Sequence, residues 1–465
     1  MSILANRYAS DEMKEIWSPR SKIIAERKLW ITVMKTQSEL GFDIPSSAIS
    51  SYEKVLEKID LESIDKRERE LRHDVKARID EFNSLAGHQY IHIGMTSRDL
   101  TENIEAYQIH AALKLINFKT LVLLYHLGGR IEEFKSLAIV GRSHNVPAQI
   151  TTLGKRFATI AEELIFAQAI LVNLIELFPI RGLKGPVGTS QDGLDLLGDR
   201  FEDLERVLVK SLGFERALDS TGQIYPRSID FQVIASLVTL AAAPSNMATS
   251  IRLMAGHDLV SEGFKQGQVG SSAMPHKINT RSCERIHGLA AILKGHATML
   301  GGISGGQWNE GDVSDSVVRR VAISDAFFAI DGLYETAITI LRELVIFREV
   351  ISEEIALNLP FLATSKLLLA AVKKGMGREE AHETIRLACE LVSREKRSGL
   401  KTLLQVKLGE QRSFPLNYDE IEELFLNPTE FIGLSEKQCD RVIIKIKRIL
   451  ENNPDVTRYL PNPII

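Results

Sequence analysis

The stretch FATIAEELIFAQAILVNLIELF, residues 157–178, decides the fold class. Its apolar side chains recur at alternating spacings of three and four residues, at Phe157, Ile160, Leu164, Ala167, Leu171, Leu174 and Phe178. This spacing places them on one face of an α-helix. Similar patterns run over residues 101–127, 230–253, 284–300 and 316–347, whereas alternation with a period of two is nearly absent. We therefore predict an all-α protein with long central helices.

Chain length and the distribution of these patterns indicate more than one domain. The 465 residues are too many for a single hydrophobic core. We expect three helical domains: a smaller N-terminal unit over residues 1–97, a long-helix bundle over residues 98–349, and shorter helices over residues 350–465. Several central helices are apolar on more than one face, which requires neighbours on more than one side. A bundle shared between the subunits of a homo-oligomer would supply them, and a large monomeric bundle is the alternative.

Composition excludes several classes of partner. The formal net charge is −4 and no segment is strongly basic, which disfavours nucleic acid and favours a small metabolite. The first residues, MSILANRYASDEMKEI, lack the apolar core of a secretory signal, and the longest apolar stretch, near residues 231–243, is too short to span a membrane. Cys283, Cys389 and Cys439 are too far apart for a disulfide framework or a zinc site. We expect a cytoplasmic protein with no membrane partner.

The segment GQVGSSAMPHKINTRSCERI, residues 267–286, interrupts the helical pattern. A Gly/Ser segment between helices is usually a linker. This one leads into a helix N-terminus, where free N–H groups and the helix dipole favour an anion. It also carries Lys277 and Asn279, a cation and an amide that suit a carboxylate. The spacing of a phosphate-binding P-loop is missing. A loop that binds a carboxylate is therefore the functional hypothesis.

Three further stretches carry candidate groups. In GRSHNVPAQITTLGKR, residues 141–156, His144 lies between a glycine and a proline and is predicted in a turn, where it is a candidate general acid or base. In HIGMTSRDLTEN, residues 92–103, Thr96 and Asp99 form a cap-like pair before a long helix, and the same hydroxyl and N–H groups would bind a carboxylate.

The third stretch, ELRHDVKARI, places His73 and Asp74 within a helical pattern, where an ordinary surface pair is the alternative. The metal motif HExxH is absent, because HETIR at residues 382–386 lacks the second histidine. We therefore expect no metal site and no cofactor.

These stretches together resemble a known family. GSSAMPHKINT at residues 270–280 is similar to the hallmark loop GSSxMPxKxNP of the fumarase/aspartase superfamily of lyases. Within that superfamily the adenylosuccinate lyases are most similar, through NRYAS (6–10), RHDV (72–75), GMTSRD (94–99), SHNVPAQITTLGKR (143–156) and QWNEGDVSDSVVRR (307–320). The resemblance implies cleavage of adenylosuccinate to AMP and fumarate, and release of fumarate from the succinylated aminoimidazole carboxamide ribotide of purine biosynthesis. It also implies three helical domains in a homotetramer whose active sites are shared between subunits.

The resemblance implies a role for each matching residue. Ser271 would be the base, delivered by a loop over residues 263–281 that closes on the substrate, and His144 the general acid. His73 would be a second active-site histidine on the phosphate side, Lys277 would stabilise the developing charge, and Glu284 would orient the His144 position. The implied substrate-binding residues are Arg7, Tyr8, Asp74, Thr96, Ser97, Gln223, Asn279, Arg285, Ser316 and Arg320.

The chain departs from the family pattern at three positions. Thr280 and Ile150 replace common prolines, which removes no reactive group. Gly311 stands where many relatives have an arginine that contacts the substrate; Arg281 and Arg319 are arginines that could take its place. Alternatives are another lyase of the superfamily, such as argininosuccinate lyase, fumarase, aspartase or a muconate cycloisomerase, and a non-catalytic helical scaffold. The Arg7-Tyr8 and His73-Asp74 pairs favour a nucleotide substrate.

Overall fold

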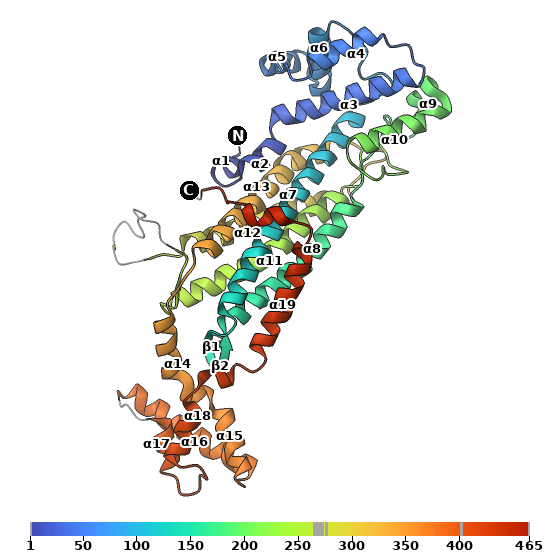
Figure 1. Ribbon diagram of the computed structural model, residues 1–465. Helices are drawn as coiled ribbons and strands as arrows, with labels where there is room; N and C mark the ends of the chain where they lie inside the picture. Colours follow the sequence, from blue (N-terminus) through green and yellow to red (C-terminus); the bar gives the residue numbers. More distant parts are fainter. Residues whose placement is uncertain (1, 264–273, 275–277, 400–402, 464–465) are drawn as a thin grey trace.

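The protein is an elongated stack of helices (Figure 1). The computed structural model describes residues 2–263, 274, 278–399 and 403–463. A long bundle forms the middle, with a smaller group of helices at each end. The strands of the described part form two small sheets, each of two strands. The prediction of an all-α protein with long central helices is confirmed.

The N-terminal end contains short helices packed on one longer helix. The hydroxyl of Ser18 accepts a hydrogen bond from the backbone N–H of Ser21 at 3.0 Å, and Pro19 occupies the first helical position, so this helix begins at a normal cap. Trp30, Tyr52 and Phe82 are buried in the core beneath it. The elements are α1 (Ile3–Arg7), α2 (Asp11–Ile16), α3 (Pro19–Glu39), α4 (Ser46–Lys54), α5 (Leu61–Leu71) and α6 (Asp74–Ala86).

Five long helices form the central bundle, as the apolar patterns predicted. They are α7 (Ser97–Phe134), α8 (Leu153–Leu177), α11 (Ser228–Ala255), α12 (Arg281–Ile303) and α13 (Ser314–Glu343). The connection after α8 contains α9 (Gln191–Leu197), η1 (Gly198–Arg200) and α10 (Phe201–Ser211). Leu197, Phe201, Leu204 and Leu208 of this connection pack into the N-terminal core.

A β-hairpin between α7 and α8 was not predicted. It pairs β1 (Ala138–Ser143) with β2 (Val146–Thr152) in antiparallel order. The strands are short, and only three residues of β1 and two of β2 are fully buried, so the sequence has no long period-two pattern. A second pair joins β3 (Val260–Ser261) to β4 (Val345–Ile346).

The C-terminal part forms the opposite end and then returns to the bundle. Its elements are α14 (Arg348–Leu362), α15 (Thr364–Lys373), α16 (Arg378–Arg397), α17 (Leu404–Gly409), α18 (Tyr418–Phe425), η2 (Pro428–Phe431), α19 (Ser435–Leu450) and η3 (Pro454–Arg458). Helix α19 packs on α7 and α8 and adds Val442, Ile443 and Ile446 to the central core. The predicted domain limits lie close to the starts of α7 and α14, but the central core also takes in residues 4–13 and 439–456. The division into three domains stays a prediction.

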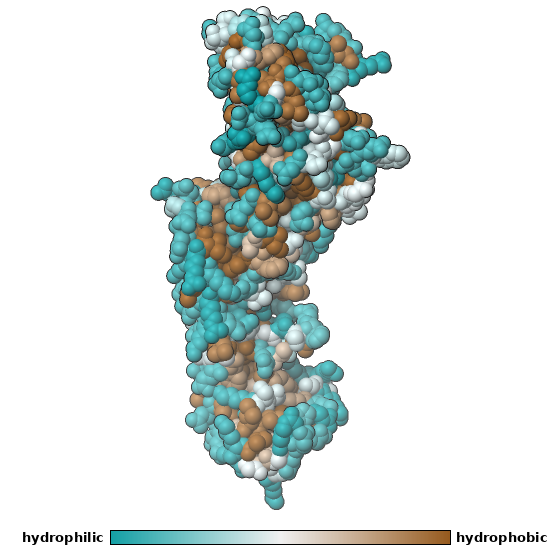
Figure 2. Space-filling model, turned by 90° about the vertical axis from the view of Figure 1, so that its right-hand side faces the viewer, coloured by the Kyte–Doolittle hydropathy of each residue, from teal (hydrophilic) through white to brown (hydrophobic). Residues whose placement is uncertain are grey.

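Two helices of the described part, α8 and α11, are long and apolar enough to cross a membrane by length and composition alone. The stretch that we considered too short to span, residues 231–243, thus belongs to a helix of 28 residues. Both helices pack inside the bundle, α8 against α7, α11 and α19, and α11 also against α12 and α13. Apolar side chains nevertheless reach the surface along the bundle (Figure 2), among them Phe166, Leu177, Leu253, Val317 and Val321.

Candidate active site

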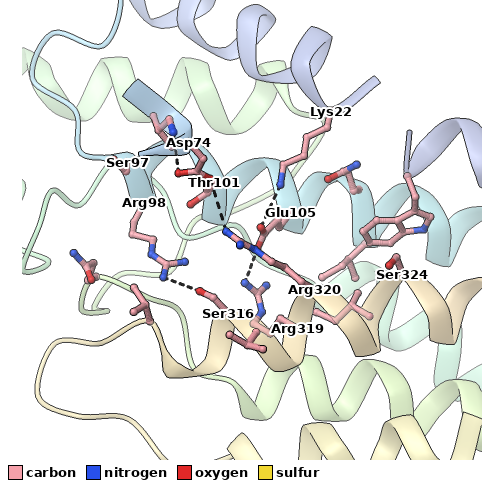
Figure 3. Close-up of a pocket in the computed structure, with 18 of the residues that line it drawn as sticks. Lys22, Asp74, Ser97, Arg98, Thr101, Glu105, Ser316, Arg319, Arg320 and Ser324 are labelled. Carbon is pink, nitrogen blue, oxygen red and sulfur yellow. Dashed lines mark hydrogen bonds and ion pairs between the residues drawn. The ribbon is translucent and has the colours of Figure 1, made fainter. Parts of the chain in front are cut away.

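The first turns of three helices, α6, α7 and α13, meet at a cavity of about 700 Å³ near the N-terminal end of the bundle (Figure 3). A helix N-terminus has unpaired N–H groups and the positive end of the helix dipole, so three of them together favour an anion. The cavity brings together seven of the predicted site residues: His73, Asp74, Thr96, Ser97, Gln223, Ser316 and Arg320. A volume of this size is typical of a site for a small ligand.

His73 is the N-cap residue of α6. The prediction that His73 and Asp74 lie within a helix was wrong for His73, because α5 ends at Leu71, Arg72 adopts a left-handed conformation and α6 begins at Asp74. The Nδ1 atom of His73 accepts a hydrogen bond from the backbone N–H of Lys76 at 3.3 Å. In the neutral ring the proton must then be on Nε2, which is left as a donor for a ligand.

The predicted cap before the long helix is confirmed. The backbone N–H of Thr96 donates to Oδ2 of Asp99 at 2.8 Å, and α7 begins at Ser97. The other carboxylate oxygen of Asp99 accepts from the side chain of Arg181 and from the backbone N–H of Lys184 at 2.9 Å. Asp99 is therefore buried and structural, and it fixes Thr96 and Ser97 at the cavity wall.

The cavity is positively charged. Lys22, Arg98, Arg319 and Arg320 supply four cations and Asp74 and Glu105 two carboxylates, which leaves +2 when His73 is neutral. Burial raises the pKa of Asp74, but Arg78 and a hydrogen bond from the backbone of Val75 outweigh it and hold the pKa below its ordinary value. Burial also raises the pKa of Glu105, but nearby cations, mainly Arg319, outweigh this effect and lower the pKa to about 2. Both carboxylates are ionised at neutral pH, so neither is a general acid.

Arg7, Tyr8 and Arg285 form a second group that does not line this cavity. The guanidinium carbon of Arg285 lies 5.7 Å from the ring centre of Tyr8, and that of Arg7 lies 6.0 Å from it. A β-carbon added to Gly332 of α13 would lie 2.6 Å from the β-carbon of Tyr8, so this close contact requires glycine. The structure thus brings these three predicted binding residues together.

A buried ion cluster holds the segment that carries Arg7 and Tyr8. The backbone N–H of Ser10 donates to Asp331 at 2.6 Å, and the ammonium group of Lys119 donates to the hydroxyl of Ser10 at 2.9 Å. Lys119 is fully buried and forms ion pairs with Asp331 and Glu335. The N-terminal segment is therefore fixed to the bundle through α7 and α13.

His144 lies apart from both groups. It is exposed in the turn between β1 and β2, with a φ of +51°, so the predicted turn is confirmed. The hairpin packs against α14, towards the end of the bundle opposite to α6 (Figure 1). Within one copy of the chain, His144 therefore does not reach the cavity that contains His73.

The remaining predicted residues lie at or near the start of α12. Glu284 is exposed in its first turn, and its carboxylate lies 3.9 Å from Arg252. Asn279 is half-buried just before this helix. Ser271 and Lys277, and with them most of the loop over residues 263–281, lie outside the described residues.

Comparisons with known proteins decide the family. A family model described as "Lyase" matches residues 7–295, and another, "Adenylosuccinate lyase C-terminus", matches residues 360–442. The adenylosuccinate lyase of Saccharomyces cerevisiae is 34% identical over 451 residues, which are 95% of this chain and 93% of the relative. That of Schizosaccharomyces pombe is 32% identical, with coverages of 95% and 93%. The chain belongs to the adenylosuccinate lyase family.

Solved structures confirm the fold. The 3-carboxy-cis,cis-muconate lactonizing enzyme of Pseudomonas putida superposes with a TM-score of 0.84 at 18% identity, covering 96% of this chain and 99% of that one. The fumarate lyase of Mesorhizobium sp. BNC1 gives 0.80 at 20% identity, with coverages of 94% and 98%. The all-α architecture is thus shared by proteins that are named for different activities.

Two residues, Gly311 in the loop before α13 and Arg319 in that helix, bear on how the cavity is charged. Gly311 has a φ of +139°, which an L-residue with a side chain rarely adopts, so its loop is built for glycine. Arg319 is buried and donates to Asp230, Glu105 and the hydroxyl of Tyr225. Each of its three nitrogens thus donates to a protein group.

Arg98, which lines the cavity beside Ser97, was not among the predicted site residues. The motif GMTSRD that was used for the family contains it, but the residue was treated as part of a capping sequence. The available signal was a cation in the first turn of a helix, where a positive side chain opposes the helix dipole and needs another reason to be there.

Proposed function

We propose that this chain cleaves adenylosuccinate to AMP and fumarate, and that it releases fumarate from the succinylated aminoimidazole carboxamide ribotide. The observation that carries the proposal is similarity over nearly the whole chain to curated adenylosuccinate lyases, at 34% and 32% identity. The cavity supports it, because its excess of two positive charges and three helix N-termini suit a substrate with a phosphate and carboxylates.

The reaction is a β-elimination. A proton leaves the carbon next to a carboxylate, the electron pair forms the double bond of fumarate, and the C–N bond breaks. Negative charge builds up on that carboxylate in the transition state, so donors placed around it lower the barrier most. We assign this role to Lys277 and Asn279 together with Thr96 and Ser97.

Two groups move protons. Ser271 takes the proton from carbon, and because an alkoxide is costly in water, the site must be electropositive and exclude water. His144 gives a proton to the leaving purine nitrogen, with Glu284 orienting the ring. His73, whose Nδ1 is used in the helix cap, binds through Nε2 on the phosphate side with Gln223, Ser316 and Arg320, beside Asp74. Arg7, Tyr8 and Arg285 contact the nucleotide.

Each active site would be assembled from several copies of the chain in a homotetramer. Two observations support this. The hairpin that carries His144 lies at the end of the bundle opposite to α6, whose first turn lines the cavity (Figure 1). His144 can therefore act as general acid in the cavity only if another copy of the chain brings its hairpin there. Large apolar side chains on α8, α11 and α13 are exposed, Phe166 by 67% and Val317 by 69%. Such surfaces are typical of interfaces between subunits.

The remaining expectations concern cofactors and location. No cofactor or metal is part of the proposed chemistry. All three cysteines lie in the described part and are free thiols, which fits a reducing compartment, and we expect the enzyme in the cytoplasm.

The direct test is a steady-state assay of purified enzyme with adenylosuccinate, followed by ultraviolet absorbance and by quantifying fumarate. We expect one fumarate for each adenylosuccinate consumed. Argininosuccinate and malate serve as controls, on which no turnover is expected. Turnover of a control alone would reassign the substrate within the superfamily, and no turnover of any of them would support the scaffold alternative.

A further inference from the structure

Resting on the function proposed above, we propose that Arg98 binds the phosphate group of the nucleotide. Arg98 is in the first turn of α7, and its side chain reaches across the cavity to α13 (Figure 3). Its Nη2 donates to the hydroxyl of Ser316 at 3.1 Å, and its Nη1 donates to Glu102 at 3.0 Å. These two bonds hold the guanidinium at the wall formed by the start of α13.

Arg98 keeps donors for a ligand. A guanidinium has five N–H groups. Among the residues that the structure describes, Arg98 uses two of them, and its side chain is 13% exposed at the cavity. Three N–H groups are therefore available to an oxyanion, for which a planar guanidinium is well suited.

The neighbouring arginines are less suited to this role. Arg319 has all three of its nitrogens engaged, as described above. Arg227 spends both terminal nitrogens on Glu102, at 2.8 Å each, and its Nε lies 2.6 Å from Asp315. Arg320 is 74% exposed and lies 3.8 Å from Asp74, so it is poorly fixed. Arg98 therefore keeps more unused N–H groups than Arg319 or Arg227, including its Nε–H, and it is better fixed than Arg320.

The loop at Gly311 cannot supply the missing guanidinium. A β-carbon there would lie 3.1 Å from Cγ1 of Ile224, and the positive φ makes any side chain strained. This loop and Ser316 both border the start of α13. The guanidinium of Arg98 reaches Ser316 from α7. It therefore supplies a positive charge at the start of α13, where the loop that contains Gly311 supplies none.

The test compares binding of AMP with binding of adenosine, which differ by the phosphate group. In Arg98→Met we expect the dissociation constant of AMP, measured by titration calorimetry, to rise about ten- to hundredfold, the usual weight of a hydrogen bond to a charged group. Adenosine, which lacks the phosphate, should bind within about twofold of wild type. For adenylosuccinate, KM should rise more than kcat falls.

Two variants control for structural effects. Arg98→Met should fold, because Glu102 keeps its ion pair with Arg227 when Arg98 is lost. Arg98→Lys keeps the positive charge and should raise the dissociation constant of AMP by less than Arg98→Met does. Arg130→Met removes an arginine from the same helix, far from the cavity, whose side chain is 18% exposed. This variant should change the dissociation constant of neither AMP nor adenosine. The inference is overturned if Arg98→Met weakens the binding of AMP and of adenosine equally, or if it leaves the dissociation constant of AMP unchanged. Failure of wild-type turnover would contradict the proposed function instead.

Discussion

Replacing His144 by alanine is expected to lower kcat for adenylosuccinate by about 10²–10⁴, the usual contribution of a positioned general acid. Without the imidazole, the purine nitrogen must leave as an anion or take its proton from water. His144 is exposed in the turn of the hairpin, so its loss should leave the thermal unfolding temperature unchanged. Steady-state kinetics and a thermal melt measure the two quantities.

The matched control is His382→Ala, which removes another exposed histidine, from α16 in the C-terminal part. It should retain wild-type kcat. A His144→Ala enzyme with unchanged kcat would remove this residue from the mechanism, and another group would have to protonate the leaving nitrogen.

Replacing Ser271 by alanine is expected to abolish turnover while leaving adenylosuccinate binding measurable. The hydroxyl is assigned to remove the proton from carbon, and its loss leaves no group to take that proton, whereas the phosphate and carboxylate contacts are untouched. Quench assays over hours set the limit on turnover, and calorimetry gives the dissociation constant of the bound substrate.

Ser272→Ala is the control, because it removes the adjacent hydroxyl from the same loop and should keep most of the activity. Turnover retained in Ser271→Ala would place the base elsewhere, with Ser272 or a histidine as the next candidate. Loss of both binding and turnover in Ser271→Ala would indicate a structural role instead of a catalytic one.

The helices and their caps could be predicted because their signals are local. The apolar stripe over residues 157–178 lies on α8 and its C-cap, and Thr96 caps α7 as predicted. The hairpin around His144 was missed because strands of six and seven residues, mostly unburied, have no clear alternation. His73 was placed inside a helix because the left-handed turn at Arg72 has no glycine to mark it.

Which residues meet in the site was harder to predict than which motifs contribute to it. Motifs identified His73, Thr96 and Ser316, which the fold brings to one cavity, but spacing along the chain could not show that His144 lies at the other end of the bundle. It also could not show that Arg98 reaches Ser316 or that Arg319 is already fully engaged. The contacts of Arg98 with Ser316 and of Arg319 with Asp230 join side chains that are 218 and 89 positions apart in the sequence.

The measurement that tests the account most directly mixes the two inactive variants. His144→Ala and Ser271→Ala chains are co-expressed with different affinity tags, and assemblies carrying both tags are assayed with adenylosuccinate. If each site takes His144 and Ser271 from different copies, random assembly leaves roughly a quarter of the sites intact, and about that share of wild-type activity should return. Mixed assemblies that are as inactive as either variant alone would contradict a site shared between subunits.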